Sequence, residues 1–77
     1  MYRCYILKYY DFRRDKINIS DLCRKCDISR GTFYNIINNI SEPSVSVALK
    51  ITKYLDRQLV LQGYQSGVYP IDVLFRY

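Results

Sequence analysis

Residues 17–39, INISDLCRKCDISRGTFYNIINN, contain two short apolar patterns with helical spacing, and these patterns decide the fold. In each pattern the apolar side chains fall on one face of a helix, and the polar positions are left outward. Two adjacent apolar faces of this kind predict a compact pair of helices rather than one long rod. The inward residues are Leu22, Cys23 and Cys26 in the first pattern, and Phe33, Ile36 and Ile37 in the second.

Each of the two helices begins with its own capping signal. Asn18 can cap the first helix, with Asp21 three positions on as an acidic variant of the capping box, and Ser29 can cap the second. Apolar pairs at hydrophobic-staple spacing flank the caps, namely Ile17 with Leu22 and Ile28 with Phe33. The two capped helix starts lie so close in the sequence that only two helical turns and a tight turn of the chain fit between them. This arrangement predicts a helix-turn-helix, the geometry that places a second helix in the DNA major groove.

This motif resembles the Cro/C1-type (Xre-like) helix-turn-helix family of phage and bacterial transcriptional regulators. The resemblance runs from about Ile17 to Leu55, roughly half of the chain. Asn18 stands where the family has a serine cap, and Ser29 where a serine opens the recognition helix. The other matching positions are Leu22 and Cys23 for a Leu-Ala pair, Ile28 for a small apolar residue, and Pro43, Ser44 and 45–55 for a proline followed by a capped helix.

Two positions depart from the family pattern. The turn glycine is replaced by Asp27, which tolerates a positive φ better than most residues and so preserves the turn with some strain. The usual glutamine at the start of the first motif helix is replaced by Ile19, which cannot make a glutamine's hydrogen bonds.

Length and composition predict a single domain over residues 1–77, with the motif at about 18–39. Half of the residues are apolar, so the chain is not of the disordered class. A formal charge of +5 suits a polyanion bound through its phosphates, although a basic domain without such a partner has the same charge. Cations cluster in or beside the motif, diluted by three aspartates; they are Arg13, Arg14, Lys16, Arg24, Lys25 and Arg30.

The remaining segments predict a mainly all-α fold of four or five helices, similar to the lambda-repressor-like DNA-binding domains. Residues 2–14 favour a helix, with a strand over 2–10 as the alternative. Residues 38–43 read as a loop ended by Pro43. Ser44 can cap a helix to about Leu55, whose expected inward residues are Val45, Ala48, Leu49, Thr52 and Leu55.

The sequence leaves more alternatives open for the structure of the C-terminal part. Residues 58–61 either extend the fourth helix or form a strand, and Gly63 and Gly67 mark a loop. Pro70 suits the first turn of a short last helix, and the tail has room for a short strand. Apolar residues make 57–77 either a dimerisation surface or the segment that closes the core; they are Leu59, Val60, Leu61, Ile71, Val73, Leu74 and Phe75.

DNA contact is the main functional hypothesis, and it centres on the start of the second motif helix. Arg30 can bond bidentately to guanine, Asn35 can read adenine, and Asn38 suits a phosphate. Gly31 weakens the helix but lets the backbone approach DNA closely. The full candidate set is Ser29, Arg30, Gly31, Thr32, Tyr34, Asn35 and Asn38, with Asn18 and Lys25 on the first helix. The simpler interpretation is a solvated helix face, with Tyr34 packed at a domain edge.

Catalysis and metal binding have little basis in this sequence. The C-x-x-C pair of Cys23 and Cys26 lacks the further ligands that zinc needs, because the chain has no histidine and one other cysteine, Cys4. Both positions fall where the family has small or apolar core residues, which predicts buried thiols. The missing histidine also removes the common general base. We therefore expect no enzyme, no metal and no cofactor.

The predicted function is sequence-specific binding of double-stranded DNA by a transcriptional repressor, as a homodimer on paired half-sites. The alternative is a small phage or mobile-element protein that binds a protein partner, as an inhibitor, an anti-CRISPR-like protein or an antitoxin. In that case a tyrosine-rich surface binds the partner and the helix-turn-helix serves autoregulation. No signal peptide or membrane-length apolar run is visible, and the odd number of cysteines precludes a complete internal disulfide framework, so we expect a cytoplasmic protein.

Overall fold

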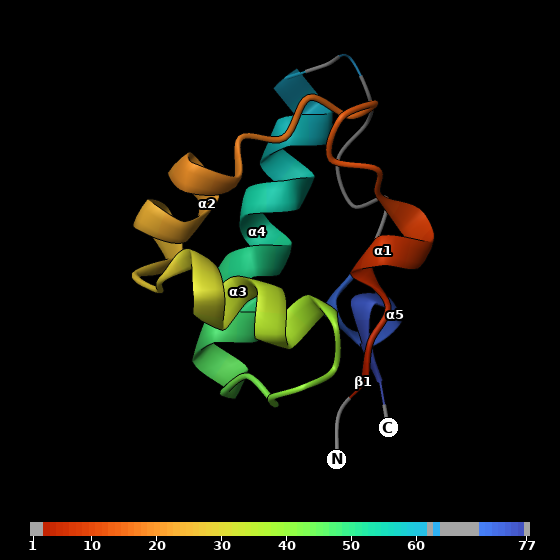
Figure 1. The fold of residues 1–77 in the computed structure, drawn as a ribbon. Coiled ribbons are helices and arrows are strands. Elements are labelled where there is room, and N and C mark those ends of the chain that lie inside the picture. Colours follow the sequence, from red (N-terminus) through yellow and green to blue (C-terminus); the bar gives the residue numbers. More distant parts are fainter. Residues whose placement is uncertain (1–2, 62, 64–69, 77) are drawn as a thin grey trace.

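The computed structural model describes residues 3–61, 63 and 70–76, and its two central helices lie where the sequence places them. α2 spans Ile19–Cys26 and α3 spans Arg30–Ile37 (Figure 1). The Asn18 side chain accepts a hydrogen bond from the Asp21 amide at 3.0 Å, and Ser29 Oγ accepts one from the Thr32 amide at 3.1 Å. Both predicted caps are therefore confirmed.

The corner between the two helices depends on Asp27. This residue adopts the left-handed conformation, with φ 59° and ψ 44°, and its amide donates to the carbonyl of Arg24 at 3.3 Å. The chain then turns and the Ile28 amide donates back to the carbonyl of Cys23 at 3.0 Å. Asp27 thus adopts the left-handed backbone conformation that the family's glycine usually provides. Its Cβ makes this conformation strained.

α4 spans Val45–Leu61, longer than expected, so residues 58–61 are helical rather than a strand. Ser44 Oγ accepts from the Val47 amide at 3.2 Å, as a cap would. The predicted inward face is wrong for Val45 and Leu49, which are exposed, and Thr52 is half-buried. The helix is rotated so that its buried stripe is a neighbouring one, made of Ala48, Ile51, Tyr54, Leu55 and Leu59.

The predicted helix over residues 2–14 is wrong. The segment instead forms a strand, β1 (Arg3–Cys4), one helical turn, α1 (Ile6–Tyr9), and turns over 12–16, while residue 2 lies outside the described part. Two sets of hydrogen bonds stabilise the observed backbone instead of a continuous helix. The Tyr5 amide donates to the Leu74 carbonyl at 2.7 Å, and the Asp11 carboxylate accepts from the amides of Arg13 and Arg14.

The end of the described chain completes a small sheet beside β1. Pro70 precedes α5 (Ile71–Leu74), as predicted, and β2 (Phe75–Arg76) follows directly. β1 and β2 pair antiparallel, with Arg3 opposite Arg76 and Cys4 opposite Phe75. Gly63 has a φ of 97° in the expected turn, whereas Gly67 falls outside the described residues.

A side-chain amide fastens β1 to the end of α3. Asn39 Oδ1 accepts from the Cys4 amide at 2.6 Å, and Asn39 Nδ2 donates to the Cys4 carbonyl at 3.2 Å. Asn39 itself has a φ of 61°, a conformation that asparagine adopts more readily than most residues. We call this pair of hydrogen bonds the Asn39 clasp. It links the N-terminal strand to the helix pair across 35 positions of sequence.

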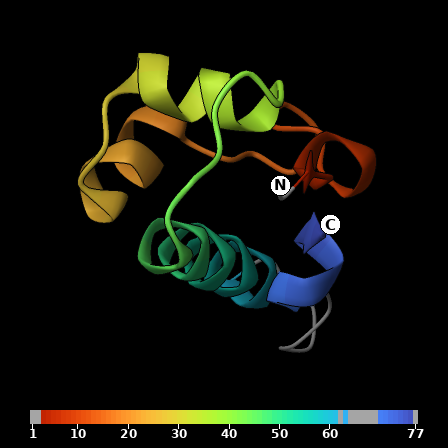
Figure 2. The same ribbon diagram turned by 90° about the horizontal axis from the view of Figure 1, so that it is seen from below.

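The core lies between the helix pair and α4, and elements from both ends of the chain close it. The largest fully buried side chains are Phe33, Ile6, Leu22, Ile36, Ile51, Leu55, Leu74 and Cys26. Leu74 belongs to segment 57–77, whose residues Leu59 and Phe75 are buried as well, so part of this segment closes the core. Figure 2 shows α3 on one side of the domain, with α4 and α5 on the opposite side. Within the described ranges, no helix has the length and hydropathy to cross a membrane.

Candidate nucleic-acid interface

α3 is anchored by one face and exposed along the other. Its buried side chains are Phe33, Ile36 and Ile37, and the Phe33 ring packs against Phe12 with centroids 5.8 Å apart. The remaining residues of the helix are exposed. Because successive helical residues are 100° apart, Gly31 and Asn35 lie opposite the buried face. The helix is therefore available to a partner on the outer side of the domain.

The first turn of α3 combines a cap formed by its own residues with an exposed cation. The Ser29 and Thr32 hydroxyls bond to each other at 2.8 Å, besides the capping bond from the Thr32 amide. Both side chains are thus committed to holding the helix start. Arg30 is exposed, and within the described part of the chain its guanidinium has no carboxylate partner. Next to it, Gly31 leaves bare backbone on the surface.

Further along the helix, the candidate side chains differ in their exposure and in the contacts that they already make. Tyr34 is 45% exposed and its ring meets the edge of Phe33 at 5.9 Å, so it is both a surface and a packing residue. Asn35 is exposed. Asn38 Nδ2 donates to the Tyr34 carbonyl at 2.9 Å, which turns this side chain back onto the last turn of its own helix.

The two candidates on α2 lie at opposite ends of that helix. Asn18 is exposed, but its side-chain oxygen caps the helix through the Asp21 amide. Lys25 is exposed in the last turn, with Nζ 4.0 Å from an Asp21 oxygen. The structure thus groups seven of the candidates on α3 and its two caps, and leaves Asn18 and Lys25 at the two ends of α2; the seven are Ser29, Arg30, Gly31, Thr32, Tyr34, Asn35 and Asn38.

Sequence reasoning missed a polar contact that ties α2 to α4. The Tyr54 hydroxyl donates to Asp21 Oδ2 at 2.8 Å, and Arg24 pairs with the other carboxylate oxygen. The Tyr54 bond, followed by the Arg24 bond, lowers the pKa of Asp21. Burial, followed by the bond to Asp21, raises the pKa of Tyr54 to about 12. The sequence held no signal for this contact, because Tyr54 lies outside the inward face predicted for this helix and is 33 positions from Asp21.

Comparison with known proteins agrees with this geometry. A helix-turn-helix family model matches residues 12–61. The chain belongs to the Cro/C1-type helix-turn-helix family. This is a family of DNA-binding regulators, and the matched residues cover α2, α3 and α4 in full. No match was found among curated proteins.

At the start of α2, where Cro/C1-type proteins carry a glutamine, this chain has Ile19. Ile19 is half-buried and packs against the core rather than presenting a polar group. Ile19 therefore cannot supply the polar contact that the family makes from the start of α2. The nearest polar groups in the sequence are Asn18 and Ser20, both exposed.

The cysteines of this Cro/C1-type domain are structural. Cys23 and Cys26 are free and buried, as predicted, Cys4 is free and buried as well, and burial raises the pKa of each thiol. Among the described residues no group of histidine, cysteine or acidic side chains is placed to hold a metal ion. Of the described tyrosines, Tyr10 and Tyr54 are buried, Tyr5 and Tyr9 are half-buried, and Tyr34 is exposed.

Proposed function

We propose that the protein recognises a specific duplex DNA sequence with the outer face of α3 and represses transcription as a dimer on paired half-sites. The observation that carries this proposal is the start of α3. A cap and a buried apolar face hold that turn in place, while Arg30 and Gly31 are exposed on its surface. Recognition helices contact bases through residues near the N-terminal end.

The proposed roles follow from the side chains and their present contacts. Arg30 reads a guanine through its O6 and N7 atoms, and Asn35 reads an adenine. Gly31 allows the helix backbone to sit close to the groove. Asn18 and Lys25, at the two ends of α2, contact DNA phosphates. Lys25 turns away from Asp21 to make its contact. Ser29 and Thr32 keep the helix start in place, and Tyr34 lies at the edge of the contact.

Repression requires only occupancy of a promoter. A domain that binds its operator tightly excludes polymerase from the same DNA without any second activity. Two copies on adjacent half-sites raise both affinity and specificity, because one recognition helix reads only a few base pairs. The dimer is therefore part of the proposed mechanism.

Selection of bound fragments from a random duplex library tests DNA binding and gives the recognition sequence. We expect a short motif repeated with two-fold symmetry. Affinity for that site should fall steeply as salt is raised, because cations that contact phosphates release counterions. A partner bound through an apolar protein surface would be nearly indifferent to salt, so the titration also separates the alternative function.

The role of Arg30 is tested on the selected site. Arg30→Ala should weaken binding by about 1–3 kcal/mol and relax the preference at one base position. The matched control is Arg57→Ala, which removes the same charge from an exposed position on α4, the helix on the opposite side of the domain from α3. Equal losses for the two variants would show that Arg30 contributes charge alone, and an unchanged affinity would remove it from the interface.

A further inference from the structure

Two arginines lie side by side on the small sheet that β1 and β2 form, which we call the β1–β2 ribbon. Arg3 on β1 is directly opposite Arg76 on β2, and both residues are exposed. Their neighbours Cys4 and Phe75 are buried. Because successive side chains of a strand point to opposite faces, the two arginines share the outer face of the ribbon. Side chains directly opposite each other in an antiparallel pair have Cβ atoms about 4.5–5.5 Å apart.

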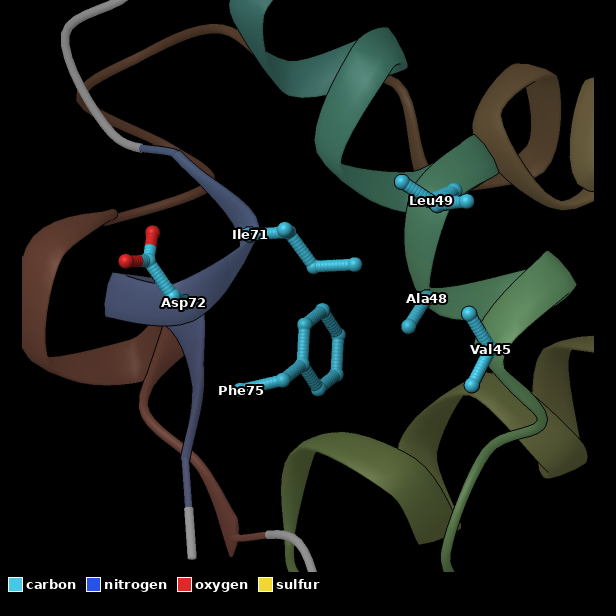
Figure 3. Close-up of a pocket in the computed structure, with 6 residues that line it drawn as sticks. All are labelled: Val45, Ala48, Leu49, Ile71, Asp72 and Phe75. Carbon is cyan, nitrogen blue, oxygen red and sulfur yellow. The ribbon is translucent and has the colours of Figure 1, made fainter.

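Phe75 fixes the direction in which this outer face points. Its ring points toward α4 in an apolar cleft, where Ala48 and Ile71 are among the lining residues (Figure 3). The outer face of the ribbon, with both arginines, is therefore turned away from α4. Figure 2 shows α4 on the side of the domain opposite α3, so both arginines point away from the side that is farthest from α3.

The arginine pair concentrates positive charge without a compensating acid. Within the described ranges neither guanidinium forms an ion pair, since the cations of the ion pairs found there are Arg14, Arg24 and Lys25. Like charges directly opposite each other destabilise a sheet, and an anion bound between them would remove the repulsion. Guanidinium groups offer planar forks of N–H donors that match the oxygens of a phosphate. The pair therefore has the chemistry of a phosphate-binding site.

The ribbon is fastened to the helix that carries the proposed DNA contact. The Asn39 clasp joins Cys4, the neighbour of Arg3, to the residue that follows the C-cap of α3. In Figure 1, β1 accordingly lies beyond the C-terminal end of α3. Both strands fall outside residues 12–61, so the ribbon is an element that this chain adds to the matched helix-turn-helix domain.

The length of α3 favours a DNA phosphate as the occupant of the site. Its 8 residues make a helix about 12 Å long, and the major groove is about 12 Å wide. A helix whose first turn contacts the bases therefore brings its last turn to the edge of the groove, where the sugar-phosphate backbone runs. Carboxylates of an acidic protein carry the same charge as a phosphate, but the position beside the end of α3 favours DNA.

We propose that Arg3 and Arg76 together hold a backbone phosphate of the bound duplex, beside the groove that α3 enters. This inference rests on the proposed function, because α3 sets the position of the duplex. The contact adds affinity and helps to orient the domain on DNA. It carries no base preference, because contacts to phosphates do not read the sequence. Base preference and phosphate contact can therefore be measured separately.

The test replaces both arginines by glutamine, which removes the charges and keeps long polar side chains. The double variant Arg3→Gln, Arg76→Gln should lower the steepness of log affinity against log salt concentration by about 1 and leave the preferred base sequence unchanged. The matched control is Lys53→Gln, Arg57→Gln, which removes two charges from exposed positions of α4 and should keep the wild-type salt dependence. Thermal melting establishes that both double variants are folded.

An unchanged salt dependence, or an equal change in the control, would overturn the assignment of the arginine pair and leave the proposed function intact. An arginine variant that loses its base preference would overturn the assignment as well. A wild type that binds duplexes without base preference would contradict the proposed function, and the salt dependence would then decide the role of the pair by itself. A wild type that binds no duplex would overturn both proposals.

Discussion

Replacing Gly31 by alanine should stabilise the fold and weaken DNA binding at the same time. Gly31 is the second residue of α3, and glycine costs at most about 0.5–1 kcal/mol relative to alanine there, which is its cost in the middle of a helix. An added Cβ would meet its nearest neighbour, Ser29 Oγ, at 3.9 Å, which is an ordinary contact. The free energy of unfolding should therefore rise by about that amount, and the melting temperature by about 2–8 °C.

The new methyl group would stand on the outer face of α3, opposite Phe33 and its neighbours. If the backbone approaches the groove floor there, the methyl separates helix and DNA, and we expect affinity for the selected site to fall at least tenfold, or about 1.4 kcal/mol. Thermal melting by circular dichroism and anisotropy titration of a labelled duplex measure the two effects. The readouts control each other, since a variant that binds less because it is misfolded would melt earlier.

A Gly31→Ala variant that melts later and binds as tightly as wild type would refute the close approach at this position. α3 would then be a solvated face at Gly31, or would meet DNA through a different part of the helix. An earlier melting would instead contradict the open space that the structure shows around the glycine.

Three further predictions concern the scaffold. Asn39→Ala should lower the free energy of unfolding by about 3 kcal/mol in urea, about 2 from two lost hydrogen bonds and about 1 from a Cβ residue at positive φ; Asn39→Gly should lose only the first part, and equal losses would contradict this division. Tyr54, with a pKa of about 12 in the folded state against about 10 when unfolded, contributes stability that is complete below pH 10 and is lost as the pH rises from 10 to 12. Melting temperatures of Tyr54→Phe should therefore fall less over that interval than those of wild type, and parallel curves would argue against the shift. The three cysteines, buried and with raised pKa values, should react with a thiol reagent only as fast as the protein unfolds, and a rapid burst in the native state would show an accessible thiol.

Local chemistry made the helix pair predictable from the sequence. The caps by Asn18 and Ser29 act over three residues, and the left-handed turn at Asp27 depends on one residue and its immediate neighbours. Apolar spacing then fixed the buried faces of α2 and α3. The same features placed the candidate interface, because capping and amphipathic pattern decide which side chains of α3 remain outside. Their individual contacts with DNA stay predictions.

The errors occurred where distant partners decide between local options. The apolar spacing of residues 2–10 fits a helix, but pairing of Cys4 with Phe75 diverts the chain into a strand. On α4, two neighbouring stripes are both apolar enough to face inward, and packing against α2 selects the one that leaves Val45 and Leu49 outside. The contacts from Tyr54 to Asp21 and from Asn39 to Cys4 span 33 and 35 positions, and no spacing rule anticipates them.

The Asn39 clasp has a consequence for how this domain is completed during synthesis. β1 leaves the ribosome early and β2 only after α2, α3 and α4, so the first strand must wait for its sheet partner while most of the chain is translated. Asn39 emerges in between, and its amide can hold the backbone of Cys4 in strand-like pairing during that interval. A chain that lacks this side chain would leave the backbone N–H and C=O of Cys4 without these two hydrogen bonds, so that β1 would depend on β2 alone for its pairing.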